Sequence, residues 1–383
     1  MDADWTHSAQ AMQRRIEATA TSLTGGFPHW ADPRTGVWTT TPDGDWTGGA
    51  LPGMLWLAQR ASGGQALHDL AQIWSLRLRP RVRLQTAFKG FGFYYGAALG
   101  HMLAEDAPAR ALALEAALSL RGQFDSALGL IPLGLDAEES GEVGRAFSSI
   151  DSLQATPLLF WAARQTGDAA YAECATHHTT RVLEIHARAD GSIIQSSELA
   201  AEDGAVLRRF THKGAGDSSV WGRAQAWGML YAVMAHAQCP QETRWLDWSM
   251  RAADWWLDHV PSGMVSFWDF DDPAIPNTAY DTAATAIVCA ALLKLAALAP
   301  VAASRERYRD AAERTARALV SRYLTPAAPG DARPPGMLVG GCFNKRRDSR
   351  PSDHVDNAEL VFGSYFLFES LQVLRGIVRA QDL

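Results

Sequence analysis

Apolar residues recur along most of this 383-residue chain with the three-to-four-residue spacing of α-helices, and the strict alternation typical of strands is scarce. The pattern predicts twelve helices, at residues 8–23, 48–61, 64–78, 91–104, 108–121, 151–164, 169–185, 219–237, 242–259, 282–298, 305–323 and 359–375. A chain of this kind is expected to be all-α.

The predicted helices alternate between two kinds. Segments 243–260 and 304–323 carry polar residues on one face and Trp, Leu or Ala on the other, whereas segments 92–104 and 281–298 are almost entirely apolar and rich in small residues. A helix that is apolar all round is a buried one. Six buried helices alternating with six half-exposed ones predict two concentric rings, an (α/α)6 barrel, in which Gly and Ala let the inner helices approach closely.

The connections between the predicted helices also fall into two classes. Long, Gly-rich and polar loops precede the inner helices, and the connections that follow inner helices are short. The long ones span residues 24–47, 122–150, 186–218, 260–280 and 324–356. This order gathers the long loops on one face, where function usually resides. No domain linker is visible, so residues 1–383 are expected to form a single domain.

Composition excludes several classes of protein. Hydrophobic residues make up 47% and charged residues 20%, which predicts a sizeable core, and the net charge of −7 comes with no basic cluster that would bind nucleic acid. The sequence contains no apolar run long enough for a membrane span. Residues 1–13 lack the apolar region of a secretory signal. A cytoplasmic location is therefore expected.

Metal and cofactor chemistry have no support in the sequence. The four cysteines are widely spaced and are expected to be buried thiols, and HExxH, P-loop, GxGxxG and GxSxG motifs are absent. We therefore expect no metal and no cofactor. Monomer and homodimer both remain open.

Unusual residues cluster in the long loops and at the starts of inner helices. Trp46, Trp221 and Trp227 are candidate sugar platforms, because the flat ring of Trp matches the apolar face of a sugar, although a Trp at a helix start is more often part of the core. Asp151 is a candidate catalytic carboxyl, or only the N-cap of its helix. Arg223 is a candidate ligand for an anion, or a structural partner for a carboxylate. Asp281 is interpreted as a helix cap.

Lysine is rare in this chain. Of 35 Lys and Arg residues only four are lysines, and Lys89, Lys213 and Lys345 fall in loop segments beside the candidate site. Chance placement in long loops would explain this as well. We favour a role in binding a negative group for Lys213 and, after it, for Lys89.

Five stretches together resemble glycoside hydrolase family 88, the unsaturated glucuronyl hydrolases, and more distantly the unsaturated rhamnogalacturonyl hydrolases. They lie at residues 46–58, 150–168, 216–232, 267–287 and 356–371, in family order across nearly the whole chain. The segment containing Trp221, Arg223, Gln225 and Trp227 is the most specific of them. The resemblance implies an (α/α)6 barrel, in agreement with the helix count.

The resemblance also implies hydration chemistry on a short anionic oligosaccharide. The substrate would carry a non-reducing 4,5-unsaturated uronic acid, and Asp151 occupies the acid/base position. A single carboxyl then protonates carbon 4 and afterwards deprotonates the water that attacks carbon 5. Ordinary glycosidases instead divide the catalytic work between two carboxyl groups. The implied substrate-binding residues are Trp46, Lys89, Gln195, Lys213, Trp221, Arg223, Trp227 and Asn357.

The chain departs from the family pattern at this site. The family has a His-Asp pair where this chain has Lys89-Gly90, a His where it has Gln195, and a Gln where it has Lys213. A second aspartate is therefore missing at position 90. Losing a neighbouring carboxylate and gaining Lys would disfavour the protonated form of the acid/base residue. The candidate carboxyls for compensation precede Asp151 in the chain, at Asp136, Glu138 and Glu139.

Three functions remain open. The first is the unsaturated uronyl hydrolase described above. The second is a hydrolase or hydratase on the same barrel that acts on a saturated or differently modified sugar, because fold alone does not fix function. The third is a non-catalytic sugar-binding relative that lost its chemistry together with the second aspartate.

Overall fold

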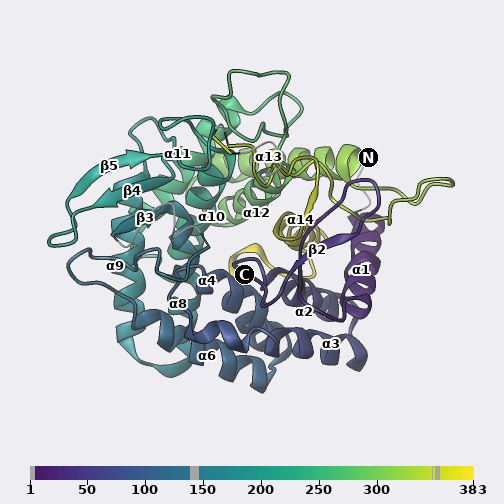
Figure 1. Cartoon of the computed structure of the whole chain (residues 1–383), viewed down its shortest axis with the longest axis horizontal. Helices are drawn as coiled ribbons and strands as arrows, with labels where there is room; N and C mark the ends of the chain where they lie inside the picture. The colour runs from purple at the N-terminus through teal and green to yellow at the C-terminus, as the bar shows by residue number, and fades with distance from the viewer. Residues whose placement is uncertain (1–4, 139–145, 347, 350–353) are drawn as a thin grey trace.

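The computed structural model describes residues 5–138, 146–346, 348–349 and 354–383. Within these residues, twelve helical segments form two concentric rings (Figure 1). The inner ring contains α2 (Ala50–Ser62), the segment of α4 (Lys89–Phe93), η2 (Tyr94–Ala98) and α5 (Leu99–Ala104), then α8 (Ala155–Thr166), α10 (Gly222–Gln238), α12 (Thr282–Leu298) and α14 (Val361–Leu374). The outer ring contains α1 (Trp5–Ser22), α3 (Gln65–Leu76), α6 (Ala107–Arg121), α9 (Ala169–His186), α11 (Thr243–His259) and α13 (Ala302–Tyr323). The predicted (α/α)6 barrel is confirmed.

Burial separates the two rings as the sequence pattern predicts. Helices α10 and α12 are buried along nearly their whole length, whereas α11 and α13 bury one face and expose the other. Each inner helix packs against its outer partner and its inner neighbours, and α14 closes the ring by packing against α12 on one side and α2 on the other. None of the helices among the described residues is long and apolar enough to cross a bilayer.

Small residues set the spacing of the inner ring. A Cβ added to Gly49 would lie 2.5 Å from the carbonyl oxygen of Gly92, and one added to Gly363 would lie 2.7 Å from the Cβ of Ala283. Any larger side chain at either position would push two inner helices apart. The Gly and Ala content of the inner helices therefore allows the close contacts that the sequence predicted.

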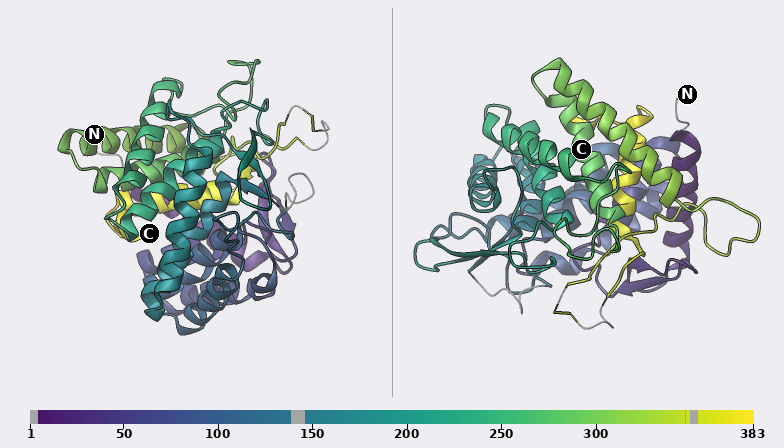
Figure 2. Two further views of the ribbon diagram at one scale, coloured as in Figure 1. Left: turned by 90° about the vertical axis from the view of Figure 1, so that its left-hand side faces the viewer. Right: turned by 90° about the horizontal axis from the view of Figure 1, so that it is seen from above.

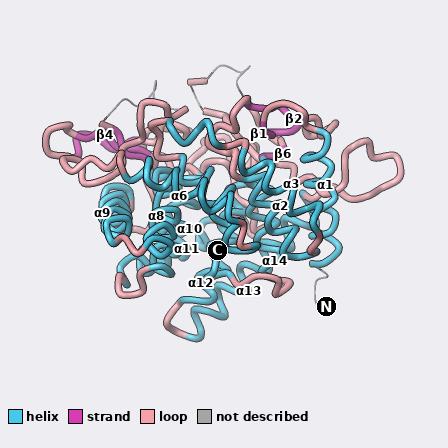
Figure 3. The backbone as a smooth tube through the Cα atoms, turned by 90° about the horizontal axis from the view of Figure 1, so that it is seen from below, coloured by secondary structure: helices cyan, strands magenta, loops and turns pink. Residues whose placement is uncertain are grey.

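Two small antiparallel sheets lie in the long loops, and neither was predicted from the sequence. β1 (Phe27–Ala31) pairs with both β2 (Trp38–Thr41) and β6 (Glu359–Leu360). β4 (Ser196–Leu199) lies between β3 (Phe147–Ser149) and β5 (Val206–Phe210). All six strands gather at one end of the barrel (Figures 2 and 3). The long loops and the starts of the inner helices therefore share this end, as predicted.

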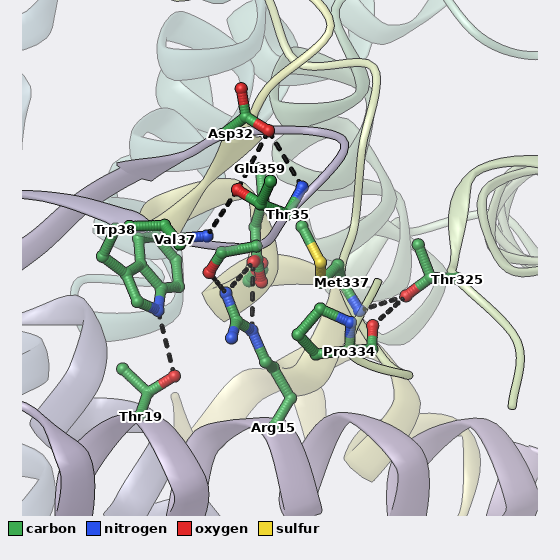
Figure 4. A network of polar contacts seen from close by, with 12 residues as sticks. Arg15, Thr19, Asp32, Thr35, Val37, Trp38, Thr325, Pro334, Met337 and Glu359 are labelled. Carbon is green, nitrogen blue, oxygen red and sulfur yellow. Dashed lines mark hydrogen bonds and ion pairs between the residues drawn. The ribbon is translucent and has the colours of Figure 1, made fainter. Parts of the chain in front are cut away.

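A polar clasp joins the first helix to the start of the last one (Figure 4). The guanidinium of Arg15, on α1, donates to the Glu359 carboxylate at 2.8 Å and to the Gly36 carbonyl at 2.8 Å. Glu359 is buried and belongs to β6, which pairs with β1 directly before α14 begins. Segments more than 300 residues apart in sequence are thereby fixed to each other beside the open end of the barrel.

Candidate active site

Asp151 lies at the junction of β3 and the inner helix α8. A short 3-10 helix, η3 (Ile150–Gln154), connects the two, and its N-cap is Ser149, not Asp151. The Ser149 hydroxyl donates to Asp151 Oδ2 at 2.6 Å, and Gln195 Nε2 lies 3.5 Å from the same oxygen. The alternative that Asp151 is only the N-cap of its helix is therefore wrong, because Ser149 occupies that position.

The Asp151 side chain lines a cavity at the loop-bearing end of the barrel. The cavity holds about 500 Å³ of space, including its opening to solvent. Its walls come from four inner-helix regions and from two long loops. The lining residues are Trp46, Phe88, Asp151, Gln154, Lys213, Trp221, Arg223, Trp227, Phe343 and Asn344. Aromatic rings, a carboxyl and two cations thus face one small volume.

The three predicted tryptophans all reach this cavity, but they differ in exposure. Trp46 is partly exposed, whereas Trp221 and Trp227 are buried. Trp227 stacks on Tyr231 with their ring centroids 5.6 Å apart and an interplanar angle of 19°. Trp227 is therefore both part of the core and part of the cavity wall. Trp46 lines the cavity with a ring that is partly exposed.

Arg223 connects several segments that surround the cavity. Its guanidinium donates to Asp281 Oδ2 at 2.8 Å and to the carbonyls of Cys342 and Phe343 at 2.5 and 2.6 Å. The same group lies 4.5 Å from the ring of Trp221. Arg223 is thus both a lining residue and the structural partner of a buried carboxylate, the second of the two roles left open by the sequence.

Asp281 does more than the capping role assigned to it from the sequence. It caps α12 by accepting hydrogen bonds from the backbone N–H groups of Ala283 and Ala284. It also pairs with Arg223 while fully buried. The start of α12 is therefore coupled through Arg223 to the loop that carries Phe343.

Lys213 lines the cavity, whereas Lys89 does not. The Lys89 ammonium is buried and donates to the Val82 carbonyl at 3.0 Å and to the Ser119 hydroxyl at 2.7 Å, and burial lowers its pKa to about 8. The prediction that Lys89 binds a substrate is not supported by its position, because α4 directs this side chain between η1 (Arg79–Arg83) and α6.

Two further predicted residues, Gln195 and Asn357, do not line the cavity. Gln195 is fully buried and links the site internally: its Nε2 faces Asp151, and its Oε1 accepts from the backbone N–H of Lys213 at 2.9 Å. Asn357 is exposed, with a left-handed backbone (φ 54°), and its carbonyl accepts from Gly340. From the same C-terminal loop, Phe343 and Asn344 line the cavity instead.

The position of the missing second aspartate has no room for a side chain. A Cβ on Gly90 would lie 2.1 Å from the carbonyl oxygen of Gln154 and 2.5 Å from the Cα of Ala155. Helix α4 therefore packs with its backbone directly on the start of α8. Glycine at position 90 is a requirement of this packing, and a carboxylate could not be restored there without moving one of the two helices.

The carboxyls proposed as substitutes serve other contacts. Asp136 accepts from the backbone N–H of Gln85 at 2.7 Å. Glu138 lies 2.5 Å from Arg81, and burial together with neighbouring Asp45 raises the pKa of Glu138 to about 9. Glu139 lies outside the described residues. Among the described residues that line the cavity, Asp151 is the only carboxyl.

Four lining residues escaped the sequence analysis: Phe88, Gln154, Phe343 and Asn344. Gln154 follows Asp151 by three residues on the same short helix, a spacing that could have identified it. The loop path that brings Phe343 and Asn344 to the cavity depends on long-range pairing with residue 355. No local pattern indicates such a contact.

Comparison with known proteins agrees with this architecture. No family model matches the sequence. The unsaturated glucuronyl hydrolase of Bacillus sp. (strain GL1) is 31% identical over 361 residues, covering 92% of each chain. The crystal structure of the Bacillus sp. GL1 enzyme superposes with a TM-score of 0.86, 26% identity and 97% coverage of both chains. The unsaturated chondroitin disaccharide hydrolase of Streptococcus pyogenes serotype M1 is 28% identical over 339 residues, covering 85% of this chain and 80% of that one.

The barrel, its cavity and these similarities define a glycoside hydrolase. The chain belongs to the unsaturated glucuronyl hydrolase family, glycoside hydrolase family 88.

Proposed function

We propose that this enzyme hydrates the 4,5 double bond of a non-reducing unsaturated uronic acid and so releases the next sugar of a short anionic oligosaccharide. The observation that carries the proposal is the carboxyl of Asp151, the only one among the described residues that line a cavity walled by Trp46, Trp227 and Lys213. Hydrolysis of a saturated glycoside normally needs two carboxyls on opposite sides of the bond. Hydration of a vinyl ether needs one carboxyl in two protonation states.

In this reaction Asp151 first donates its proton to carbon 4, so that positive charge develops at carbon 5 and the ring oxygen. The carboxylate then removes a proton from the water that attacks carbon 5. The resulting hemiketal opens, and the glycosidic bond breaks to release the next sugar and a keto acid. Hydrogen bonds from Ser149 and Gln195 orient Oδ2 of Asp151 for both steps.

The negative charge of this substrate is complementary to the cationic groups that line the cavity. Lys213 is a point charge suited to the uronate carboxylate, and Trp46 offers a flat apolar face to a sugar ring. Relatives of this chain include enzymes named for glucuronyl and for chondroitin disaccharide substrates. We therefore place unsaturated uronyl disaccharides, with glucuronate-type rings, first among the candidate substrates.

The test is a spectroscopic assay on lyase-derived unsaturated disaccharides, in which hydration removes the ultraviolet absorbance of the conjugated double bond. Asp151→Asn is expected to lower kcat at least a thousandfold, the scale of losing acid/base catalysis on both steps. Asp203→Asn is the matched control, because Asp203 is exposed on the β4–β5 connection and only accepts from the Ala205 backbone. Turnover of saturated glycosides with none of unsaturated ones would overturn the proposal, as would full activity in Asp151→Asn.

A further inference from the structure

Gln154 is a buried polar residue with an unmet hydrogen-bonding requirement. Its side chain is 1% exposed and lines the cavity beside Asp151. Among the described residues, its Oε1 accepts no hydrogen bond. A buried amide oxygen left unpaired costs about 1–3 kcal/mol, so native structures rarely keep one without a reason.

The local backbone directs Gln154 to the same side as the acid/base carboxyl. Both residues lie on η3 (Ile150–Gln154), a 3-10 helix in which side chains three positions apart eclipse each other. The hydroxyl of Ser149 and the amide of Gln195 already contact Asp151 Oδ2. Gln154 therefore adds a neutral acceptor on the cavity wall next to a carboxyl that is otherwise held from the β3 side.

The glycine at position 90 packs against the backbone of Gln154. Because a Cβ at Gly90 would lie 2.1 Å from the Gln154 carbonyl oxygen, α4 and the end of η3 are in direct backbone contact. The absence of a side chain at position 90 therefore allows the close contact between α4 and the backbone of Gln154. In this chain the cavity wall between α4 and α8 presents a neutral amide, with no carboxylate from position 90.

We infer that Gln154 is a substrate-binding residue, whose Oε1 accepts a hydrogen bond from a ring hydroxyl of the uronic acid held against Asp151. This inference rests on the function proposed above. Oε1 is an acceptor and cannot bind the uronate carboxylate, which carries no proton, so Gln154 Oε1 and the Lys213 ammonium contact different groups of the same ring.

Two variants of Gln154 and one control test the inference. Gln154→Met keeps the length of the side chain and removes the acceptor; we expect KM for the unsaturated disaccharide to rise about five- to tenfold with kcat within about twofold of wild type. Gln154→Glu keeps an acceptor oxygen but adds a negative charge; the ratio of its KM to that of wild type should be largest at neutral pH and should fall as acid protonates the new carboxyl. Gln372→Met makes the same change at a fully buried glutamine of α14 that does not line the cavity, and its KM should match wild type.

Binding measurements separate this inference from the proposed function. In an Asp151→Asn background, which prevents turnover, quenching of tryptophan fluorescence gives the Kd of the disaccharide, and adding Gln154→Met should raise that Kd about five- to tenfold. Unchanged Kd and KM in folded Gln154→Met overturn the inference while the proposed function stands. A wild-type protein that binds the disaccharide but does not consume it overturns the proposed function alone, and one that neither binds nor consumes it overturns both.

Discussion

Arg223, which lines the cavity, and Asp281, 58 residues further along the sequence, form an ion pair of 2.8 Å, with Asp281 fully buried and Arg223 nearly so. Removing one partner of such a pair leaves a charge without compensation in a medium of low polarity. The pair also joins three elements that meet at the site, because Asp281 caps α12, Arg223 belongs to α10, and its remaining donors hold the 342–343 backbone.

Asp281→Ala is therefore expected to lower the free energy of unfolding by about 3–5 kcal/mol, measured by urea denaturation. Asp168→Ala is the matched comparison, since Asp168 also caps a helix and pairs with an arginine, Arg121, but does so at the surface. We expect the loss at Asp168 to be much smaller. Equal losses at the two positions would mean that burial of the Arg223–Asp281 pair has no energetic importance.

The cavity tryptophans should divide into binding and structural residues. Trp46→Ala removes a partly exposed ring from the cavity and should raise KM about tenfold or more, with a small change in stability. Trp227→Ala removes a fully buried ring that stacks on Tyr231, and should lower the free energy of unfolding by about 3–5 kcal/mol. Kinetics and thermal denaturation on the two variants check this division, which fails if Trp46→Ala changes only stability.

Lys213 should carry the recognition of the substrate's negative charge. Lys213→Gln is expected to raise KM for an unsaturated uronate about tenfold or more, and to weaken the dependence of KM on salt, because a charge-assisted contact is lost. Lys345→Gln is the control, since the Lys345 ammonium donates to Thr278 and the residue does not line the cavity. The same KM in Lys213→Gln and wild type would refute the assignment.

Two buried histidines should make the barrel sensitive to acid. The backbone N–H of Ile131 donates to Nδ1 of His178, and Nε2 of His178 contacts the Ser152 carbonyl, so the ring bridges two segments in its neutral form. Burial lowers the pKa of His178 to about 4 and that of His186 to about 3. Both values lie below the pKa of about 6.5 in an unfolded chain.

Below pH 6.5 the unfolded chain gains protons that these folded histidines do not accept, so the free energy of unfolding falls as pH falls. The decrease is about 1.4 kcal/mol per pH unit for each histidine and continues until the folded pKa is reached. Urea denaturation between about pH 7 and pH 5 measures the pH dependence of stability, and His178→Gln should lower the loss of stability over this range by up to about 1.4 kcal/mol per pH unit relative to wild type. His177→Gln, at the exposed neighbouring position, should leave the slope unchanged.

The helices could be predicted from the sequence because their signal is local. Each inner helix is apolar on every face and each outer one on a single face, so periodicity alone separates α12 from α13. The six strands were missed because they are only two to five residues long, and some of their pairings join distant loops, such as Trp30 with Leu360. Alternation over so few residues is too short to recognise.

Site residues could be predicted where they open an inner helix. They could not be predicted where tertiary packing decides whether a side chain reaches the cavity. Asp151 and Trp46 belong to the first kind, and both line the cavity. Lys89 also opens an inner segment, α4, but it belongs to the second kind, because its ammonium is held by a carbonyl on η1 and a hydroxyl on α6. Asn357 and Asn344 share one loop, and only the path of that loop determines which of them reaches the cavity.

The contact of the last inner helix with the first elements has a consequence for biosynthesis. β6 pairs with β1, Glu359 binds Arg15, and α14 packs between α12 and α2, so the ring has an open seam until residues 359–374 have left the ribosome. Until then, the apolar flanks of α2 and α12 have no final partner and stay exposed to the cell's chaperones. A chain stopped by a nonsense codon before this segment would present those flanks permanently, and would be expected to be cleared by proteolysis before it could accumulate as a partly active enzyme.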